Sequence, residues 1–139
     1  MLLAARTTGG GYGRLPMTTD LMIGMAHHPG TLAAACDALG HAGVNIDGAF
    51  GTVTNGHPEL HVLVADATHA TRALIDAGFD ILGQRQVLAI PVENRPGTGA
   101  ALLRRVTDAG VSLDLMYTTL DGRVVLGSED MAGLRAAID

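Results

Sequence analysis

Two motifs of the same composition, Pro29-Gly30-Thr31 and Pro96-Gly97-Thr98, each stand directly before an apolar repeat of helical spacing. The first backbone N–H groups of a helix have no partner inside the helix and lie at the positive end of its dipole. Glycine has no Cβ, so a bound group can approach the backbone closely. Each motif therefore predicts a place where a carboxylate can bind, with Thr31 or Thr98 capping the helix or contacting the bound group.

A free amino acid fits this chemistry, because it carries a carboxylate together with an ammonium group that needs hydrogen-bond acceptors. Backbone carbonyls or the side chain of Asn45 could accept from the ammonium group. A structural interpretation stays open beside this one. The Pro-Gly pairs are common in tight turns, and Asn45 could simply hydrogen-bond a turn or cap a strand edge.

Histidine and cysteine are the other residues that could carry chemistry. Cys36 lies on a predicted core stripe, where a thiol is usually unreactive, and no histidine pair has the i, i+4 spacing of a zinc motif on a predicted helix. We therefore expect no metal, no cofactor and no catalytic residue. A small enzyme with His27 or His28 as general acid or base remains the alternative. The six histidines are His27, His28, His41, His57, His61 and His69.

The chain repeats itself, since Gly97 follows Gly30 and Gly110 follows Gly43 by the same 67 residues. Each copy begins with a predicted helix that ends at Gly43 or Gly110, the position of a left-handed C-terminal glycine. Both helices carry one apolar stripe, and Arg104-Arg105 falls on the opposite, solvated side of the second. The two stripes are Leu32, Ala35, Cys36, Leu39 and Gly99, Leu102, Leu103, Val106.

Strands with alternating burial follow each helix. The turn dipeptides Asn55-Gly56 and Asp121-Gly122 predict hairpins, and Pro58 is expected to widen the first turn or mark its edge. The returning strands are expected over residues 60–65 and 123–127, and second helices over 71–76 and 134–139. An opening strand starts at Asp20, and residues 78–92 could form two strands. The inward positions of the alternating strands are Val44, Ile46, Gly48, Phe50 and Val111, Leu113, Leu115, Tyr117.

This order of elements predicts an α+β fold of two tandem ferredoxin-like βαββαβ units, the second lacking its last strand. The expected division is a flexible N-terminal extension over residues 1–17, a first domain over 18–85 and a truncated second domain over 86–139. The open edge of the second domain needs protection. Residues 2–5 or another subunit could supply it.

Composition limits the classes of partner. The 139 residues are 47% hydrophobic, with a formal net charge of −5 and no basic cluster beyond two adjacent arginines, so we expect no nucleic-acid partner. No apolar run approaches the ~20 residues of a membrane-spanning helix. The single cysteine is typical of a reducing, cytoplasmic location.

The stretches "HPGT…AGVNID" and "RPGT…AGVSLD" resemble the signature of ACT domains, over about residues 18–139, and the turn "ENRPG" is the closer match. ACT domains typically bind small molecules, most often amino acids, and regulate an attached or partner enzyme. The resemblance implies a stand-alone tandem ACT protein that binds a free amino acid or similar small carboxylate. It also implies regulation of a metabolic enzyme or another regulator. Separately, we expect a homodimer, because one two-fold interface would complete the open sheet edges of both copies.

The resemblance also implies two sites between neighbouring domains. One pairs Asn45 with the turn of residues 94–98, and the mirror site pairs Ser112 with the turn of residues 27–31. The two sites differ, because serine replaces asparagine in one and His27-His28 replace Asn-Arg. We expect the site with Asn45 and Asn94 to be the better amino-acid site. The implied ligand-binding residues are Asn45, Ile46, Asn94, Arg95, Gly97, Thr98, His28, Gly30, Thr31 and Ser112.

Three functions therefore remain in competition. The first is a regulatory protein that binds an amino acid and acts through domain and subunit interfaces. The second is a structural protein–protein interaction module that binds no small molecule. The third is the small enzyme that uses His27 or His28.

Overall fold

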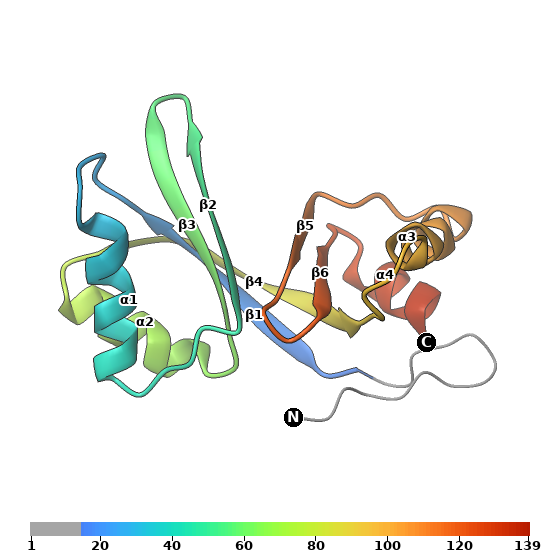
Figure 1. Ribbon diagram of the computed structural model, residues 1–139, viewed down its shortest axis with the longest axis horizontal. Helices are drawn as coiled ribbons and strands as arrows, with labels where there is room; N and C mark the ends of the chain where they lie inside the picture. The colour runs from blue at the N-terminus through green and yellow to red at the C-terminus, as the bar shows by residue number, and fades with distance from the viewer. Residues whose placement is uncertain (1–14) are drawn as a thin grey trace. The chain divides into compact units, whose positions relative to one another are not determined.

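The computed structural model describes residues 15–139 (Figure 1), which form two compact units. The first unit is Thr18–Arg85, and the second combines Gln86–Asp139 with residues 15–17. The elements are β1 (Met17–Gly24), α1 (Thr31–His41), β2 (Gly48–Thr54), β3 (His57–Val64), α2 (Ala67–Asp76), β4 (Asp80–Pro91), α3 (Thr98–Asp108), β5 (Leu115–Thr118), β6 (Arg123–Gly127) and α4 (Met131–Ile138).

The described residues form an α+β fold with one six-stranded antiparallel sheet and four helices. The hydrogen-bonded order of the strands is β2-β3-β1-β4-β6-β5. The first unit holds β2, β3, β1 and the first half of β4, and the second unit holds the rest of β4 with β6 and β5. In the first unit, α1 and α2 lie on the same side of the strands (Figure 1).

Strand β4 corrects one expectation, because residues 80–91 form a single strand of 12 residues where the sequence allowed two. Gly83 lies within this strand and is not among the glycines with positive φ. Without a turn residue, nothing interrupts the extended backbone. One strand therefore closes the first unit and opens the second.

The hairpin predicted at Asn55-Gly56 is confirmed. Thr54 pairs with His57, and the two turn residues have φ of 52° and 78°, as a type I′ turn requires. Pro58 does not widen this turn, which was one of the two expectations for it. It lies within β3 opposite Val53, and the turn keeps two residues.

The alternating residues before β2 and β5 do not belong to strands. Ladder pairing starts only at Gly48 and Leu115. The alternation is nevertheless real, because Val44 and Ile46 pack against the first core, as Val111 and Leu113 do against the second. Burial on one side can impose a period of two without ladder hydrogen bonds.

Each unit has its own apolar core. In the first, Leu21 of β1 and Val62 of β3 pack with Leu39 of α1 and Leu74 of α2. In the second, residues from β4, β6, α3 and α4 cluster with Leu15, which is 5% exposed. Leu15 therefore does not fit the flexible extension expected over residues 1–17. Residues 1–14, including the proposed edge strand at 2–5, lie outside the described residues.

The buried side of α1 is rotated from the predicted stripe. Ala35 and Leu39 are buried as expected, whereas Cys36 is exposed and Leu32 is 53% exposed. The expectation of a buried Cys36 was therefore wrong. The small residue Ala38 packs against the core instead, which turns Leu32 and Cys36, one turn apart, toward the surface.

Candidate functional site

The two Pro-Gly turns have the same backbone. Gly30 and Gly97 precede α1 and α3 with φ of 95° and 90°, in the left-handed region where glycine is favoured. Their carbonyl oxygens accept the first helical hydrogen bonds, from Ala34 and Ala101, each at 3.0 Å. The repeat seen in the sequence is therefore a repeat of local geometry.

The threonines of these turns do not cap the helices. The hydroxyl of Thr31 donates back to the carbonyl of Ala26 at 2.9 Å and to that of His28 at 3.1 Å. The hydroxyl of Thr98 makes the equivalent bonds to Glu93 at 2.6 Å and to Arg95 at 3.0 Å. The hydroxyls thus hold the turns closed, and no side chain accepts from the first N–H groups of α1 or α3.

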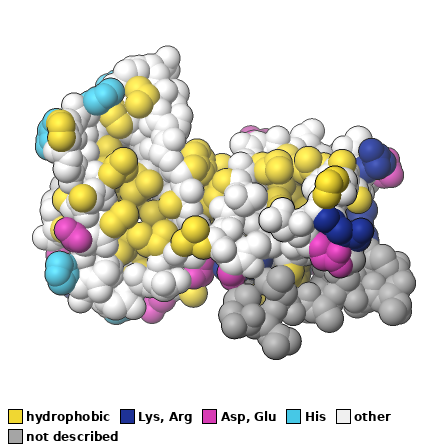
Figure 2. Space-filling view, in the orientation of Figure 1, with side chains coloured by type: hydrophobic (Ala, Val, Ile, Leu, Met, Phe, Trp, Pro, Cys, Tyr) yellow, Lys and Arg dark blue, Asp and Glu magenta, His cyan; other side chains and the backbone are white. Residues whose placement is uncertain are grey.

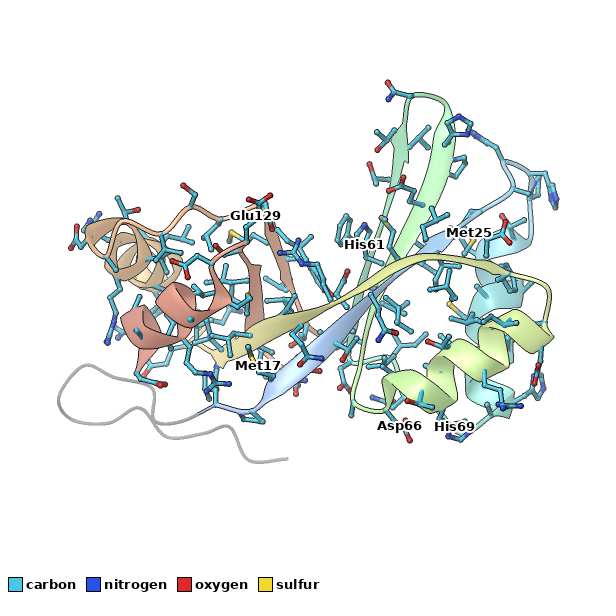
Figure 3. The ribbon with its side chains drawn as sticks, turned by 180° about the vertical axis from the view of Figure 1, so that it is seen from behind. Met17, Met25, His61, Asp66, His69 and Glu129 are labelled. Atoms are coloured by element: carbon cyan, nitrogen blue, oxygen red, sulfur yellow. The ribbon has the colours of Figure 1, made fainter. Side chains whose placement is uncertain are left out.

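Helices α2 and α4 begin differently. Asp66 accepts from the backbone N–H of His69 at 3.1 Å, and Asp130 accepts from that of Gly133 at 2.8 Å. Figure 3 shows Asp66 and His69 together at the start of α2. Capping carboxylates therefore occupy two helix starts, whereas no side chain caps the two starts at the Pro-Gly turns. At α3 the backbone N–H of Thr98 donates to the carbonyl of Arg95 at 3.4 Å, so the start of α1 is the one whose first N–H groups are available to a ligand.

Two adjoining pockets open at the first Pro-Gly turn, with volumes of about 400 Å³ and 680 Å³. Both are formed by the end of β1, the start of α1 and the β2–β3 hairpin, and the larger one also reaches the start of β4. Figure 2 shows hydrophobic side chains gathered between α1 and this hairpin. The smaller pocket is lined by Met25, Ala26, His27, His28, Pro29, Gly30, Thr31, Leu32, Gly51, Thr52, Val53, Pro58 and Glu59.

The smaller pocket combines polar and apolar groups. His27 and His28 lie on the side of the helix start, and Glu59 contributes a carboxylate from β3. Leu32 and Val53 also line it and are 53% and 54% exposed. The pocket can therefore accommodate a small molecule that has charged groups at one end and an apolar group at the other.

Asn45 and Ile46 lie in the segment between α1 and β2. The side chain of Asn45 is exposed and donates from Nδ2 to Oδ1 of Asp47 at 2.7 Å. Ile46 packs against the first core, which makes its side chain structural. The implied site pairs Asn45 with the turn of residues 94–98, which belongs to the second unit. That pairing stays a prediction.

The second Pro-Gly turn is more exposed. Nε of Arg95 lies 2.5 Å from Oε2 of Glu93, with the two side chains 60% and 53% exposed. Asn94 is exposed as well. The first turn lines pockets of about 400 Å³ and 680 Å³, which are among the best formed on residues 15–139, whereas the sequence favoured the second turn.

Ser112, the counterpart of Asn45, lines a pocket of about 330 Å³ in the second unit. Its carbonyl oxygen accepts a hydrogen bond from the hydroxyl of Ser128 at 2.6 Å, and its side chain is exposed. The implied partner of Ser112 is the turn of residues 27–31 in the first unit. That pairing also remains a prediction.

Sequence reasoning missed a buried polar pair on the first unit's sheet. Nδ1 of His61 lies 2.8 Å from Oδ2 of Asp20, and its ring stacks on Phe50 with centroids 4.2 Å apart. Strand β3 begins at His57, earlier than the strand expected over residues 60–65, so His57 and His61 share a strand face. Within residues 15–139, no group of three or more histidine, cysteine, aspartate or glutamate side chains could hold a metal ion.

Asp121 lies in the turn between β5 and β6, and its pKa is lowered. Burial would raise the pKa of its carboxyl, but hydrogen bonds from the hydroxyl of Thr119 and the guanidinium of Arg123 outweigh burial and hold it below the usual 3.8. Nε of Arg123 donates to both carboxylate oxygens, at 2.9 Å and 3.1 Å. This cluster closes the β5–β6 turn and has a structural role.

Solved structures share this fold at low sequence identity. A protein called BT0572 from Bacteroides thetaiotaomicron superposes with a TM-score of 0.78 and 22% identity, over 90% of this chain and 88% of that one. The ligand-free regulatory subunit of aspartate kinase from Thermus thermophilus superposes with a TM-score of 0.62 and 21% sequence identity, over 88% of this chain and 91% of that one. The regulatory subunit of aspartate kinase from Thermus flavus superposes with a TM-score of 0.59 and 18% identity, over 89% of this chain and 91% of that one.

No protein-family model matches the sequence, and no curated protein matches it. The similarity to the solved structures therefore concerns the fold. Among residues 15–139, no helix is long and apolar enough to cross a membrane.

Proposed function

We propose that this chain is a tandem ACT-type regulatory protein that binds a free amino acid or a similar small carboxylate at its first Pro-Gly turn. One observation carries the proposal: a pocket of about 400 Å³ opens at the uncapped start of α1. Free N–H groups at a helix start favour an anion, and a pocket of this size suits a small molecule. The site implied for Asn45 and Asn94 remains a second proposal for the same class of ligand.

The neighbours in fold support a regulatory role. Two of them are regulatory subunits of aspartate kinase, proteins named for regulation rather than catalysis. We infer that this chain is likewise no enzyme, and that ligand occupancy changes its contact with a metabolic enzyme or another regulator. Such coupling requires that the partner bind the occupied and the empty states with different affinity.

A second copy of the chain is the proposed subunit partner. Strand β2 stands at one end of the strand order, and its sequence from Gly48 to Thr54 carries no charge and no proline. Edge strands of monomeric proteins usually carry a charged residue or a proline that prevents pairing with another strand. Pairing of β2 with β2 of a second copy would satisfy both edges by two-fold symmetry.

The test is a thermal-shift panel of free amino acids, each at millimolar concentration, on the purified chain. Ligand at about a hundred times its Kd should stabilise the folded state by about 2.7 kcal/mol, which for a chain of this size raises Tm by several degrees. The expected result is a selective shift with one or a few amino acids. A flat panel would contradict the proposal and favour the interaction module.

Two matched variants locate the site. Gly30→Ala and Gly97→Ala introduce the same methyl group at nearly the same positive φ, with no atom within 4 Å of the added Cβ in either case. The expected stability loss, about 1–2 kcal/mol for a non-glycine residue in this region, is therefore similar. Loss of the ligand-induced shift in Gly30→Ala alone supports the first turn. Loss in Gly97→Ala alone would transfer the site to the second.

A further inference from the structure

We infer that the pocket at the first Pro-Gly turn is specific for α-amino acids with an apolar side chain, such as leucine, isoleucine, valine or methionine. This inference rests on the proposed function and adds the chemical class of the ligand. It is carried by the side chains that line the pocket on α1, β2 and β3, in addition to the helix start that would hold the carboxylate.

The first argument is an apolar wall with no covering residue. Leu32 on α1 and Val53 on β2 both line the pocket, yet about half of each side chain is exposed. Met25, which Figure 3 shows at the end of β1, adds a flexible apolar side chain that adapts to different shapes. A ligand with an apolar side chain would cover this surface and remove it from water.

The second argument is that this wall exists in only one copy of the repeat. Strands β2 and β3 have 7 and 8 residues, whereas β5 and β6 have 4 and 5. The longer hairpin contributes Gly51–Val53, Pro58 and Glu59 to the pocket. The two Pro-Gly turns have the same backbone, so the hairpin extension is what makes the first pocket different.

The third argument is the placement of charge. Glu59 is partly buried, lines both pockets, and forms no ion pair or side-chain hydrogen bond with any described residue. Its carboxylate is available to an ammonium group, while the N–H groups at the start of α1 are available to a carboxylate. An α-amino acid presents both groups, and its side chain then faces Leu32 and Val53.

The same arrangement disfavours charged side chains. An aspartate or glutamate ligand would place a second carboxylate near Glu59, where like charges repel. A lysine side chain would have to lose hydration against Leu32 and Val53. Small hydroxyl side chains would leave the apolar wall uncovered.

Titration calorimetry of the full chain tests the inference with leucine, isoleucine, valine and methionine against aspartate, lysine, serine and threonine. The apolar group is expected to bind at least tenfold more tightly than the polar group. Val53→Thr keeps the shape of the side chain and replaces a methyl by a hydroxyl. It should weaken leucine binding by about 3- to 10-fold while the binding of serine changes little.

Met116→Thr is the matched control, because Met116 is 51% exposed on a strand of the second unit and lines none of the pockets at the first turn. Met116→Thr should bind each amino acid with the same Kd as the unmodified chain. Glu59→Gln should weaken the binding of the apolar amino acids, whereas aspartate should lose less, because its second carboxylate no longer meets the charge of Glu59. Melting curves confirm that each variant is folded.

Two outcomes overturn the inference in distinguishable ways. Tighter binding of a polar or charged amino acid, or an unchanged preference in Val53→Thr, would refute apolar specificity and leave the proposed function intact. Absence of binding by every amino acid would refute the proposed function, and this inference with it.

Discussion

Asp20 and His61 form a buried pair between two neighbouring strands, with Nδ1 of the imidazole 2.8 Å from Oδ2 of the carboxylate. Their side chains are 1% and 12% exposed, and Phe50 stacks on the imidazole ring. Strands β1 and β3 are antiparallel neighbours, so the pair joins residues distant in sequence. A hydrogen bond between two largely buried polar groups contributes to stability, and this contribution is lost when either partner is removed.

Replacing His61 by alanine should therefore destabilise the chain by about 1–3 kcal/mol, measured as the free energy of unfolding in urea. His57→Ala is the control, since His57 is exposed on the same strand and its loss should change stability by less than about 0.5 kcal/mol. Equal effects of the two variants would show that the pair contributes nothing specific.

Arg105 should stabilise the end of α4. Its Nε and Nη2 atoms donate to the carbonyl oxygens of Ala137 and Ile138 at 3.2 Å and 3.3 Å, carbonyls that have no partner inside the helix. Arg105→Ala should cost about 1 kcal/mol, and Arg104→Ala, at an exposed neighbour, close to nothing. Thermal unfolding of the two variants in parallel would decide this, and indistinguishable Tm values would contradict it.

The lowered pKa of Asp121 predicts that the stability of the fold depends on pH in the acidic range. Its pKa is lowered in the folded state, so the ionised carboxylate stabilises the fold above the usual pKa of about 3.8, and this contribution is lost as the pH falls through the folded-state value. Asp121→Asn should thus be less stable than the unmodified chain at pH 7, by less than about 1 kcal/mol. The difference should shrink toward pH 2.5. A constant difference from pH 7 to 2.5 would argue against an ionic contribution.

The capping aspartates Asp66 and Asp130 should contribute equally to the free energy of unfolding. Asp66→Ala and Asp130→Ala each remove a carboxylate that accepts from the backbone of the first helical turn, at an expected cost of about 1 kcal/mol. Asp37→Ala, on the exposed side of α1, serves as the comparison. Should Asp66→Ala or Asp130→Ala unfold at the same urea concentration as Asp37→Ala, the caps would be energetically neutral.

Strand β2 predicts the oligomeric state. Ala49→Lys adds a charge to an exposed position of an uncharged outer strand, and in a two-fold dimer the two added lysines would repel each other across the interface. The unmodified chain should sediment as a dimer at micromolar concentration and Ala49→Lys as a monomer. A monomeric unmodified chain would rule out the proposed dimer.

Features that depend on local backbone chemistry could be predicted from the sequence. The hairpin at Asn55-Gly56 and the helix ends at Gly43 and Gly110 follow from residues that tolerate positive φ. The helix-end prediction is matched by hydrogen bonds from Val44 to Leu39 at 2.9 Å and from Gly43 to Gly40 at 3.0 Å. The repeat of 67 residues between Gly30 and Gly97 also reappeared as a repeat of turn geometry.

Features that depend on which surfaces meet could not be predicted in this way. The apolar stripe of α1 was compatible with two rotations, and packing of Ala38 rather than Cys36 against the core decided between them. The alternation at Val44 and Ile46 reflects contact with the core and carries no information on ladder pairing. Asp20 and His61 were unremarkable until adjacent strands brought them together.

The candidate site shows the same division. The sequence alone determined two Pro-Gly turns with left-handed glycines before helices, because that conformation depends on a few neighbouring residues. Only the tertiary structure decided that the first turn has a pocket, since its wall comes from a hairpin 20 or so residues further along the chain. Val53 and Glu59 reach the start of α1 through strand pairing, a long-range contact that no local pattern encodes.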